Sequence, residues 1–593
     1  MEKNTYDYGL IGNCSYQAHI KMDTNVAWMC WPRFDSSFIF GSMMDEEKGG
    51  EFSILPARGI LQSKQFYKEN TNVLCTDIET EDGWYRVTDF APRFSQNDRY
   101  YKPLMLIRKV EPLAGNPKII IKCEPRADYG NVVPKHYYAS NHIEYTGLEY
   151  DLRLTTNLSI NSILENSSIV LNEAKYLVLT YGAPLEASLT STVESFLEKT
   201  VSYWQGWVKN MSVSNFHQEL VIRSALALKI HQFEDTGAII AAGTTSLPEA
   251  PGSGRNWDYR YCWLRDTYYT LTAFSSIGHF EEMEKYFHFF LNLEENENGR
   301  YQPLYSITGQ PKIEEIITDL KGYKGNTPVR IGNQAYTHIQ NDVYGQILVS
   351  LLPLYSDHRF IYGEKADSLR IIFNILQKID KLMDEPDAGL WEFRNKQQFH
   401  SYTYLFHWAG SHAALKIGRL FDNQAMVKQA EKLIKKASAK IEECFDPERK
   451  VYTQAIGTPN LDASTLQLIA MNYIDPASPK AAEHLKALEK DLKTPEGLFY
   501  RYKHQDDFGE PETTFLICAF WYVEALACVG RISEAIEIFE KLSGYANHVG
   551  LLSEDVDEKN GSQWGNFPQA YSHVGLVNAA YRISHKLDKP NFM

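Results

Sequence analysis

The chain has 593 residues, enough for one very large domain or several of ordinary size. Its 60 Lys and Arg against 75 Asp and Glu give a net charge of -15 without a long basic run. This argues against nucleic acid and anionic membrane as partners, because phosphate binding requires clustered cations. Hydrophobic residues make up 44% of the chain and charged residues 23%, so wholesale disorder is excluded.

The N-terminal residues contain no apolar stretch of signal-peptide length, and no run of about 18 apolar residues occurs further along. We therefore expect a cytoplasmic protein. The eight cysteines are scattered without a C-x-x-C pair, which favours reduced thiols over a zinc site or a disulfide framework. The sequence is silent on the oligomeric state.

Strands are predicted across the first two hundred residues. Four segments are rich in β-branched and aromatic residues and are bounded by Gly, Asn, Pro or Asp: 84–94, 118–130, 151–160 and 168–182. Their short spacing predicts an antiparallel β-sandwich, to which we assign residues 1–188. Residues 189–210 predict a connecting helix inside a linker of residues 189–214.

From residue 215 to residue 593 the hydrophobic pattern is helical. In the segment 424–443, apolar residues recur at spacings of 3, 4, 3 and 4, with Asp422 and Asn423 available as caps. The segment 513–529 is apolar nearly all round, as is typical of a helix enclosed by others. Twelve helices are predicted, at about 216–233, 264–277, 280–294, 335–355, 364–384, 402–421, 424–443, 462–472, 478–492, 512–529, 531–545 and 567–586.

Twelve helices fit six helical hairpins closed into an (α/α)6 barrel. A solenoid would produce the same count, but no sequence repeat of 30 to 40 residues is present. The fold class expected is therefore an N-terminal antiparallel β domain, a linker helix and an (α/α)6 barrel.

Three long loops between predicted helices combine charged and aromatic residues: 244–266, 385–402 and 551–573. Six of the eleven tryptophans lie in or beside these loops or in the enclosed helix, namely Trp257, Trp263, Trp391, Trp408, Trp521 and Trp564. Aromatic faces stack on the apolar faces of sugars, and they also fill large cores. The clustering favours a site in these loops.

Two carboxyls in these loops have unlike sequence surroundings. Glu392 stands between Trp391 and Phe393, and an apolar flank raises a carboxyl pKa, which suits a general acid. Glu554 stands in a polar stretch beside Asp555, where a carboxylate stays ionised and acts as a base. Such a pair is the pattern of glycoside hydrolysis, although among 75 acidic residues a chance pair can be described the same way.

Arg265 and Asp266 follow Trp263 and offer a cation and an acceptor to the hydroxyls of one sugar ring. The alternative is a helix-start pair, with Asp266 favouring the helix N-terminus and Arg265 in a surface salt bridge. Arg330 has the same ambiguity. No phosphate-binding loop, serine-hydrolase motif or metal-ligand set is predicted.

Several of these motifs together closely resemble bacterial glycoside hydrolase family 15, the glucoamylase and trehalase-like proteins. They run in one order along the chain: residues 8–45, VTDFAPRF (87–94), TTSLPEAPGSGRNWDYRYCWLRD (244–266), PVRIGNQAYTHIQNDVYG (328–345), GLWEFR (389–394), LLSEDVD (551–557) and GNFPQAYSH (565–573). The resemblance implies an N-terminal β-supersandwich, a linker and a catalytic (α/α)6 barrel. It also implies an inverting hydrolase that releases β-glucose from the non-reducing end of α-glucosides.

The resemblance assigns roles position by position. It implies that Glu392 is the general acid and Glu554 the general base, that Arg265 and Asp266 grip the terminal glucose, and that Trp391 is a subsite wall. Further substrate contacts are expected at three positions: Arg330, by a looser match, and Trp257 and Trp263 beside the Arg-Asp pair.

An inverting pair leaves room for the attacking water, so we predict carboxyl groups roughly 6.5 to 9.5 Å apart. This mechanism requires no cofactor or metal. Two positions depart from the family pattern, Phe393 where fungal enzymes carry a second acid and Tyr404 where a lysine is common. Both concern the leaving-group side.

Four functions remain open. The leading one is an exo-acting glucoamylase-type α-glucosidase acting on maltooligosaccharide or isomaltose-like substrates, and the alternative is trehalase. A phosphorylase of the same architecture would need a phosphate pocket in place of Glu554. A non-catalytic glucan-binding module is the fourth, because a fold alone does not guarantee activity.

Overall fold

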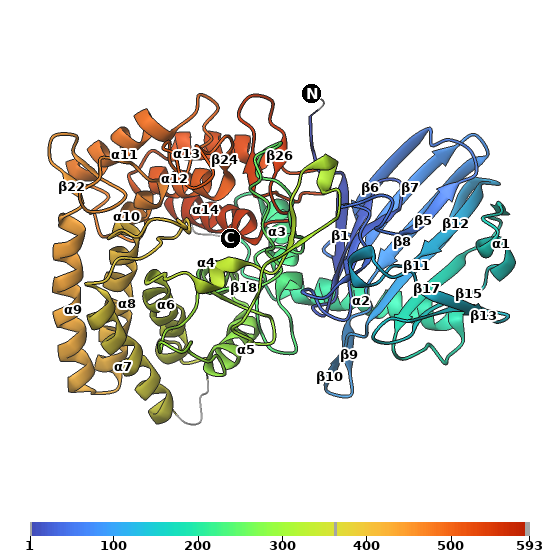
Figure 1. The fold of residues 1–593 in the computed structure, drawn as a ribbon, viewed down its shortest axis with the longest axis horizontal. Coiled ribbons are helices and arrows are strands. Elements are labelled where there is room, and N and C mark those ends of the chain that lie inside the picture. The colour runs from blue at the N-terminus through green and yellow to red at the C-terminus, as the bar shows by residue number, and fades with distance from the viewer. Residues whose placement is uncertain (1–2, 361–364, 588–593) are drawn as a thin grey trace.

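The computed structural model describes residues 3–360 and 365–587. Figure 1 shows a β-rich domain beside a larger helical domain, with helix α2 (Leu189–Lys209) running beneath the sheet. Residue 364, the first of the predicted helix 364–384, lies outside the described residues, as do residues 1–2 and 588–593 of the two predicted domains.

The N-terminal domain is a β-sandwich with antiparallel pairing between neighbouring strands. One layer is an eight-stranded sheet in the order β13-β14-β15-β17-β11-β8-β7-β6. The other combines the sheets β1-β2-β3-β4 and β16-β12-β5, with β1 packed on β7 and β8. The strands are β1 (Tyr8–Gly12), β2 (Gln17–Lys21), β3 (Val26–Cys30), β4 (Phe38–Phe40), β5 (Glu51–Pro56), β6 (Gln62–Tyr67), β7 (Leu74–Thr80), β8 (Gly83–Phe90), β9 (Phe94–Gln96), β10 (Arg99–Tyr101), β11 (Met105–Gly115), β12 (Lys118–Glu124), β13 (Lys135–Tyr138), β14 (His142–Thr146), β15 (Leu152–Thr156), β16 (Ile169–Val170) and β17 (Lys175–Tyr181).

The helical domain contains twelve α-helices within the described residues, matching the twelve predicted. They are α3 (Gln218–His231), α4 (Leu264–Ile277), α5 (Phe280–Leu291), α6 (Asp342–Ser356), α7 (Lys365–Leu382), α8 (Ser401–Leu420), α9 (Gln424–Glu442), α10 (Gln467–Ala470), α11 (Pro479–Leu492), α12 (Leu516–Cys528), α13 (Ile532–Ser543) and α14 (Ala570–Lys586). A short helix α1 (Ile160–Leu164) belongs to the sandwich. Short strands cross the barrel loops: β18 (Cys262–Trp263), β19 (Leu304–Tyr305), β20 (Ile316–Thr318), β21 (Val329–Ile331), β22 (Phe445–Asp446), β23 (Val451–Tyr452), β24 (Thr514–Phe515), β25 (Asp555–Val556) and β26 (Gln563–Trp564).

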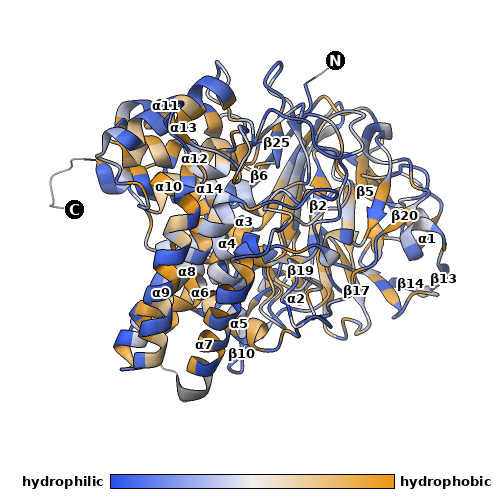
Figure 2. Cartoon of the chain, turned by 60° about the vertical axis from the view of Figure 1, so that its left-hand side comes forward, coloured by the Kyte–Doolittle hydropathy of each residue, from blue (hydrophilic) through white to orange (hydrophobic). Residues whose placement is uncertain are grey.

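The even-numbered helices form a closed inner ring. Contacts run from α4 to α6, α8, the α10 region, α12, α14 and back to α4, which is the closure of an (α/α)6 barrel and excludes the solenoid. The inner helix α12 is buried from Leu516 to Ala527, whereas the outer helix α9 buries one stripe that includes Ala430, Ala437 and Ile441. Figure 2 shows hydrophilic residues along α9 at the edge of the molecule.

Several predicted boundaries are wrong, two of them for clear local reasons. Helix α6 begins at Asp342, seven residues later than predicted, because residues 334–337 form a separate 3-10 turn capped by the side chain of Asn333. The predicted strand 168–182 is two strands, β16 and β17, which belong to different sheets. The side chain of Asn423 does cap α9, accepting from the N–H of Met426 as predicted. The domain boundaries at residues 188 and 214 remain predictions.

The sandwich supports two loops of the barrel. Tyr6 Oη donates to the carbonyl of Gly565 at 2.9 Å, and Trp28 Nε1 donates to the carbonyl of Gly243 at 2.8 Å. The ring of His19 also bonds to the carbonyl of Phe567 at 3.0 Å. These bonds fix the loops that precede α4 and α14. In the described part of the chain, no helix is long and apolar enough to cross a membrane.

Candidate active site

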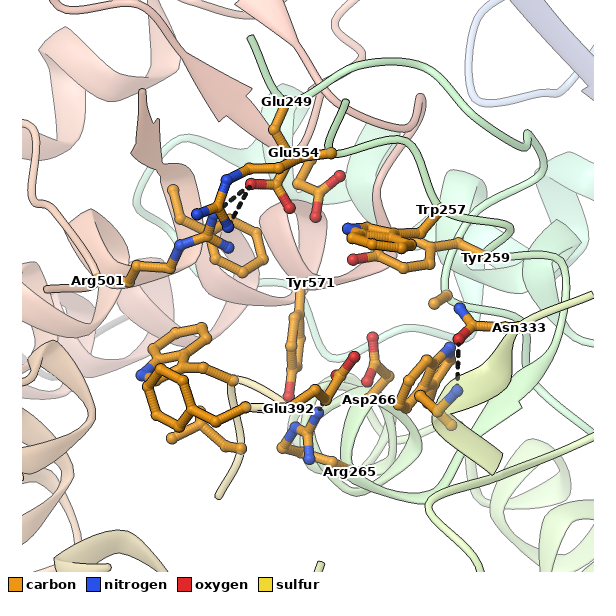
Figure 3. A pocket seen from close by; sticks show the side chains of 18 of the residues that line it. Glu249, Trp257, Tyr259, Arg265, Asp266, Asn333, Glu392, Arg501, Glu554 and Tyr571 are labelled. Carbon is orange, nitrogen blue, oxygen red and sulfur yellow. Dashed lines mark hydrogen bonds and ion pairs between the residues drawn. The ribbon is translucent and has the colours of Figure 1, made fainter. Parts of the chain in front are cut away.

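A pocket opens where the loops before the inner helices meet. Seven of the eight predicted site residues line it: Glu392, Glu554, Arg265, Asp266, Trp391, Trp263 and Trp257. They come from the first turn of α4 and from the segments leading into α4, α8 and α14. The N-terminal ends of inner helices therefore point toward the pocket, where their partial positive charge favours carboxylates. Figure 3 shows Glu392 and Glu554 on opposite sides of the space.

Glu392 is held in a strained turn at the edge of the pocket. Its φ of +63° lies in the left-handed region, which costs a residue with a Cβ about 1–2 kcal/mol. Strain of this kind clusters at functional sites. Burial raises the pKa of Glu392 to about 7, although the nearby Arg265 guanidinium lowers it. A carboxyl that is half protonated near neutral pH is suited to general-acid catalysis, as the sequence predicts.

The surroundings of Glu554 differ from those expected. The sequence places it in a polar stretch where it stays ionised, but its side chain is buried, at 1% exposure. Burial raises the pKa of Glu554 well above its ordinary value, and the carboxylates of Glu249 and Asp555 raise it further. The N–H of Asn566, which donates to Glu554 Oε2 at 3.0 Å, acts in the opposite direction. Tertiary packing therefore brings the candidate base into a crowded acidic cluster.

Arginines balance part of this negative charge. Arg501 Nη2 donates to Glu249 Oε2, and Arg255 Nη1 lies 3.9 Å from the same oxygen. Arg255 also pairs with Asp506 at 2.5 Å. Figure 3 shows Glu249 beside Glu554, with Arg501 on the same side of the pocket. The arginines stabilise ionised carboxylates in a place where burial disfavours them.

Arg265 and Asp266 are buried, which excludes the alternative of a surface salt bridge. Arg265 Nη1 donates to Gln340 Oε1 at 2.9 Å, and its Nη2 donates to Glu392 Oε1 at 3.0 Å. Asp266 is 6% exposed, and burial raises its pKa to about 7. Figure 3 shows Asp266 reaching into the pocket beside Arg265. The pair offers donors and acceptors suited to sugar hydroxyls.

The three predicted tryptophans form apolar walls. Trp391 is fixed by a hydrogen bond from Nε1 to Asp462 Oδ2 at 2.8 Å, and Trp263 lies at the buried end of the pocket with 2% exposure. Trp257 stands near the mouth, with its ring 5.1 Å from the ring of Phe508. Aromatic faces of this kind stack on the apolar faces of sugars.

Arg330 does not line the pocket. Its guanidinium lies over the ring of Trp257 at 4.4 Å, donates to the carbonyl of Asn256 at 2.6 Å and pairs with Glu315 at 3.1 Å. In this arrangement Arg330 supports the ring of Trp257, and its contact with substrate stays a prediction. Of the two positions that depart from the family pattern, Phe393 lines the pocket, whereas Tyr404 is buried in α8 and does not line it.

Several pocket residues were missed in the sequence. Glu249, Arg255, Tyr259 and Tyr571 lie inside the loops already singled out, so their proximity to the motifs was an available signal. The other group comes from the segment before α12, which carries no motif: Arg501, Asp506, Asp507 and Phe508.

Comparison with known proteins supports the same family as the motifs. A profile of the glycosyl hydrolases family 15 matches residues 215–581, and a profile described as trehalase-like, N-terminal, matches residues 6–159. A trehalase of Thermoplasma volcanium is 32% identical across 98% of this chain and 94% of its own length. A trehalase of Mycolicibacterium smegmatis is 30% identical across 97% of this chain and 91% of its own.

Among solved structures, a bacterial glucoamylase complexed with acarbose matches with a TM-score of 0.72. It covers 98% of this chain and 95% of its own, at 15% identity, so the likeness shows the shared fold. Both predicted parts of the architecture, the β-sandwich and the (α/α)6 barrel, are confirmed by this match. With a family profile covering well over half of its length, the chain belongs to glycosyl hydrolase family 15.

Proposed function

We propose that this glycoside hydrolase is a trehalase, which cleaves α,α-trehalose into two glucose molecules. The observation that carries the proposal is that relatives named trehalase match nearly the whole chain, including the N-terminal sandwich. The glucoamylase-type function that led in the sequence analysis gives way to its alternative, because the bacterial glucoamylase shares the fold at only 15% identity. The cytoplasmic location remains a prediction.

In the proposed mechanism, Glu392 protonates the oxygen that joins the two glucose units. Glu554 takes a proton from a water that attacks the opposite face of the anomeric carbon, through an oxocarbenium-like state. Arg265 and Asp266 hold the hydroxyls of the glucose that supplies this carbon. Support comes from the placement of the two carboxyls on opposite sides of one pocket. Their separation of roughly 6.5 to 9.5 Å remains a prediction of the inverting mechanism.

A proton NMR time course tests the proposal on trehalose, maltose, isomaltose and maltotetraose supplied together. Inversion of trehalose converts one glucose to the β anomer, while the leaving glucose keeps its α configuration. We therefore expect trehalose to disappear first, with α- and β-glucose appearing in equal amounts before mutarotation. A retaining enzyme would release α-glucose alone. Faster loss of maltotetraose with β-glucose as the first product would restore the glucoamylase-type function.

The same experiment addresses the remaining alternatives. A phosphorylase would consume trehalose only when phosphate is added and would release glucose 1-phosphate. A binding module would leave every sugar intact. Glu554→Gln should abolish hydrolysis while keeping trehalose binding in a calorimetric titration, because an amide replaces the base without changing the shape of the pocket.

A further inference from the structure

The pocket has a buried end and an exposed end. Trp263, Asp266 and Tyr571 at the inner end are between 2% and 6% exposed. Phe508 at the outer end is 37% exposed, and the side chain of Glu392, at 27%, has an intermediate exposure. If Arg265 and Asp266 hold the glucose that supplies the anomeric carbon, the leaving glucose lies on the outer side of Glu392.

A turn of residues 506–509, here called the outer turn, borders this outer side. Asp507 bridges it to the loop of the general acid: its Oδ2 accepts from the N–H of Arg394 at 2.5 Å, and its Oδ1 accepts from Asn395 Nδ2 at 2.8 Å. Arg394 is only two residues beyond Glu392. Asp506 ties the same turn to the loop 244–266 through Arg255 at 2.5 Å.

Side chains from the outer turn and from the loops 244–266 and 385–402 pack together at this end. The ring of Phe508 meets the ring of Trp257 edge to face, with centroids 5.1 Å apart. The Arg394 guanidinium lies 4.5 Å from the Trp257 ring and 5.2 Å from the Phe508 ring. All three residues line the pocket. Contacts between rings and a guanidinium leave no gap for a sugar chain to pass between them without displacing one of the partners.

We propose that the outer turn limits the substrate to two sugars, with Phe508 as the wall and Asp507 as the residue that holds the wall against the Glu392 loop. The proposal rests on the proposed function, which places the leaving glucose beside this wall. Residues of this chain would then explain why the substrate is a disaccharide. A third glucose must displace Phe508 and break the Asp507 bridge.

The test compares trehalose with the trisaccharide α-maltosyl α-glucoside, which is trehalose extended by one α-1,4-linked glucose. Whichever of its two bonds is cleaved, a third glucose lies outside the pair of sugars at the scissile bond. The measured quantity is kcat/KM for the trisaccharide divided by kcat/KM for trehalose. For the unmodified enzyme we expect a ratio below about 0.01, which corresponds to nearly complete exclusion of the third sugar.

Phe508→Ala and Asp507→Ala should each raise this ratio at least tenfold, since one removes the wall and the other releases it. Asp446→Ala is the matched control, because Asp446 likewise accepts two hydrogen bonds, both from backbone N–H groups of a turn, but lies outside the pocket. Phe508→Leu keeps an apolar wall and should give an intermediate ratio. It also serves as a second probe if the larger truncation does not fold.

An unchanged ratio in folded Phe508→Ala and Asp507→Ala would overturn the proposal, as would an unmodified enzyme that cleaves both sugars equally well. Failure of the proposed function is distinguishable from this. If trehalose is not cleaved and maltose is, the same variants are compared on maltose and maltotetraose. A ratio of kcat/KM for maltotetraose to kcat/KM for maltose that rises in the variants would support the wall, and an unchanged ratio would overturn it.

Discussion

Glu249→Gln should shift the pH dependence of catalysis without removing a reacting group. Glu249 is the leading charged contributor to the raised pKa of Glu554, and burial is the larger cause. The base works only when deprotonated, so a raised pKa moves the acid limb of kcat/KM to higher pH. Removing the charge of Glu249 lowers the pKa of Glu554 and should move this limb to lower pH.

The size of the shift follows from Coulomb's law. Two like charges ~6 Å apart at an effective dielectric constant of ~20 repel by about 3 kcal/mol, or roughly two pKa units. Arg501 neutralises part of the charge of Glu249 in the native protein. We therefore expect the acid limb to move down by about one to two pH units, within the range known for neighbouring charges. The basic limb, set by Glu392 with its pKa of about 7, should move down less than the acid limb, because Glu249 is only a minor contributor to that pKa.

The assay is the initial rate of trehalose hydrolysis at low substrate concentration between pH 3 and pH 9, which reports the ionisation of the free enzyme. Because Glu249 pairs with a buried arginine, the melting temperature of each variant is measured first. Glu524→Gln is the matched control: Glu524 is a buried glutamate, 3.7 Å from Arg582 and outside the pocket. An acid limb that stays in place in folded Glu249→Gln would refute the electrostatic reasoning.

Three further outcomes are expected. Glu392→Gln should lower kcat by about 10²- to 10⁴-fold and remove the basic limb near pH 7; a limb that persists in the residual activity would assign it to another group. Asp266→Asn imitates the protonated form of a group whose pKa is about 7, so its defect in kcat/KM should grow as the pH rises through 7, and a pH-independent defect would contradict this. Glu282→Gln removes the ion-pair partner of buried Lys229, 2.9 Å away, and should cost about 3–5 kcal/mol in urea unfolding. Lys229 lowers the pKa of Glu282 to about 2, against the effect of burial. The pair therefore contributes its full share of the free energy of unfolding above the ordinary glutamate pKa, and this share is lost as the pH falls toward 2. An equal cost of the substitution at pH 3 and pH 7 would contradict this reasoning.

Much of the fold was predictable because its signals are local. The 3.6-residue periodicity marks each barrel helix wherever it lies, and an all-apolar segment such as 513–529 indicates an inner helix before any neighbour is known. Short segments also marked the two carboxyls and the Arg265-Asp266 pair, since the loops that lead into inner helices are continuous in sequence. The amino-acid sequence alone therefore determines both the architecture and the location of the candidate site.

The charge state and the outer end of that site were decided only by tertiary structure. The polar residues next to Glu554 in the sequence suggested an ionised carboxylate, but folding buries this side chain beside Glu249. The partner of Glu249, Arg501, is 252 residues away along the chain, and Asp507 is 113 residues from Arg394. A pKa depends on distances and burial in space, and a pocket wall depends on which loops meet. Neither feature can be predicted from the pattern of a single segment, because each depends on contacts between segments that only barrel closure brings together.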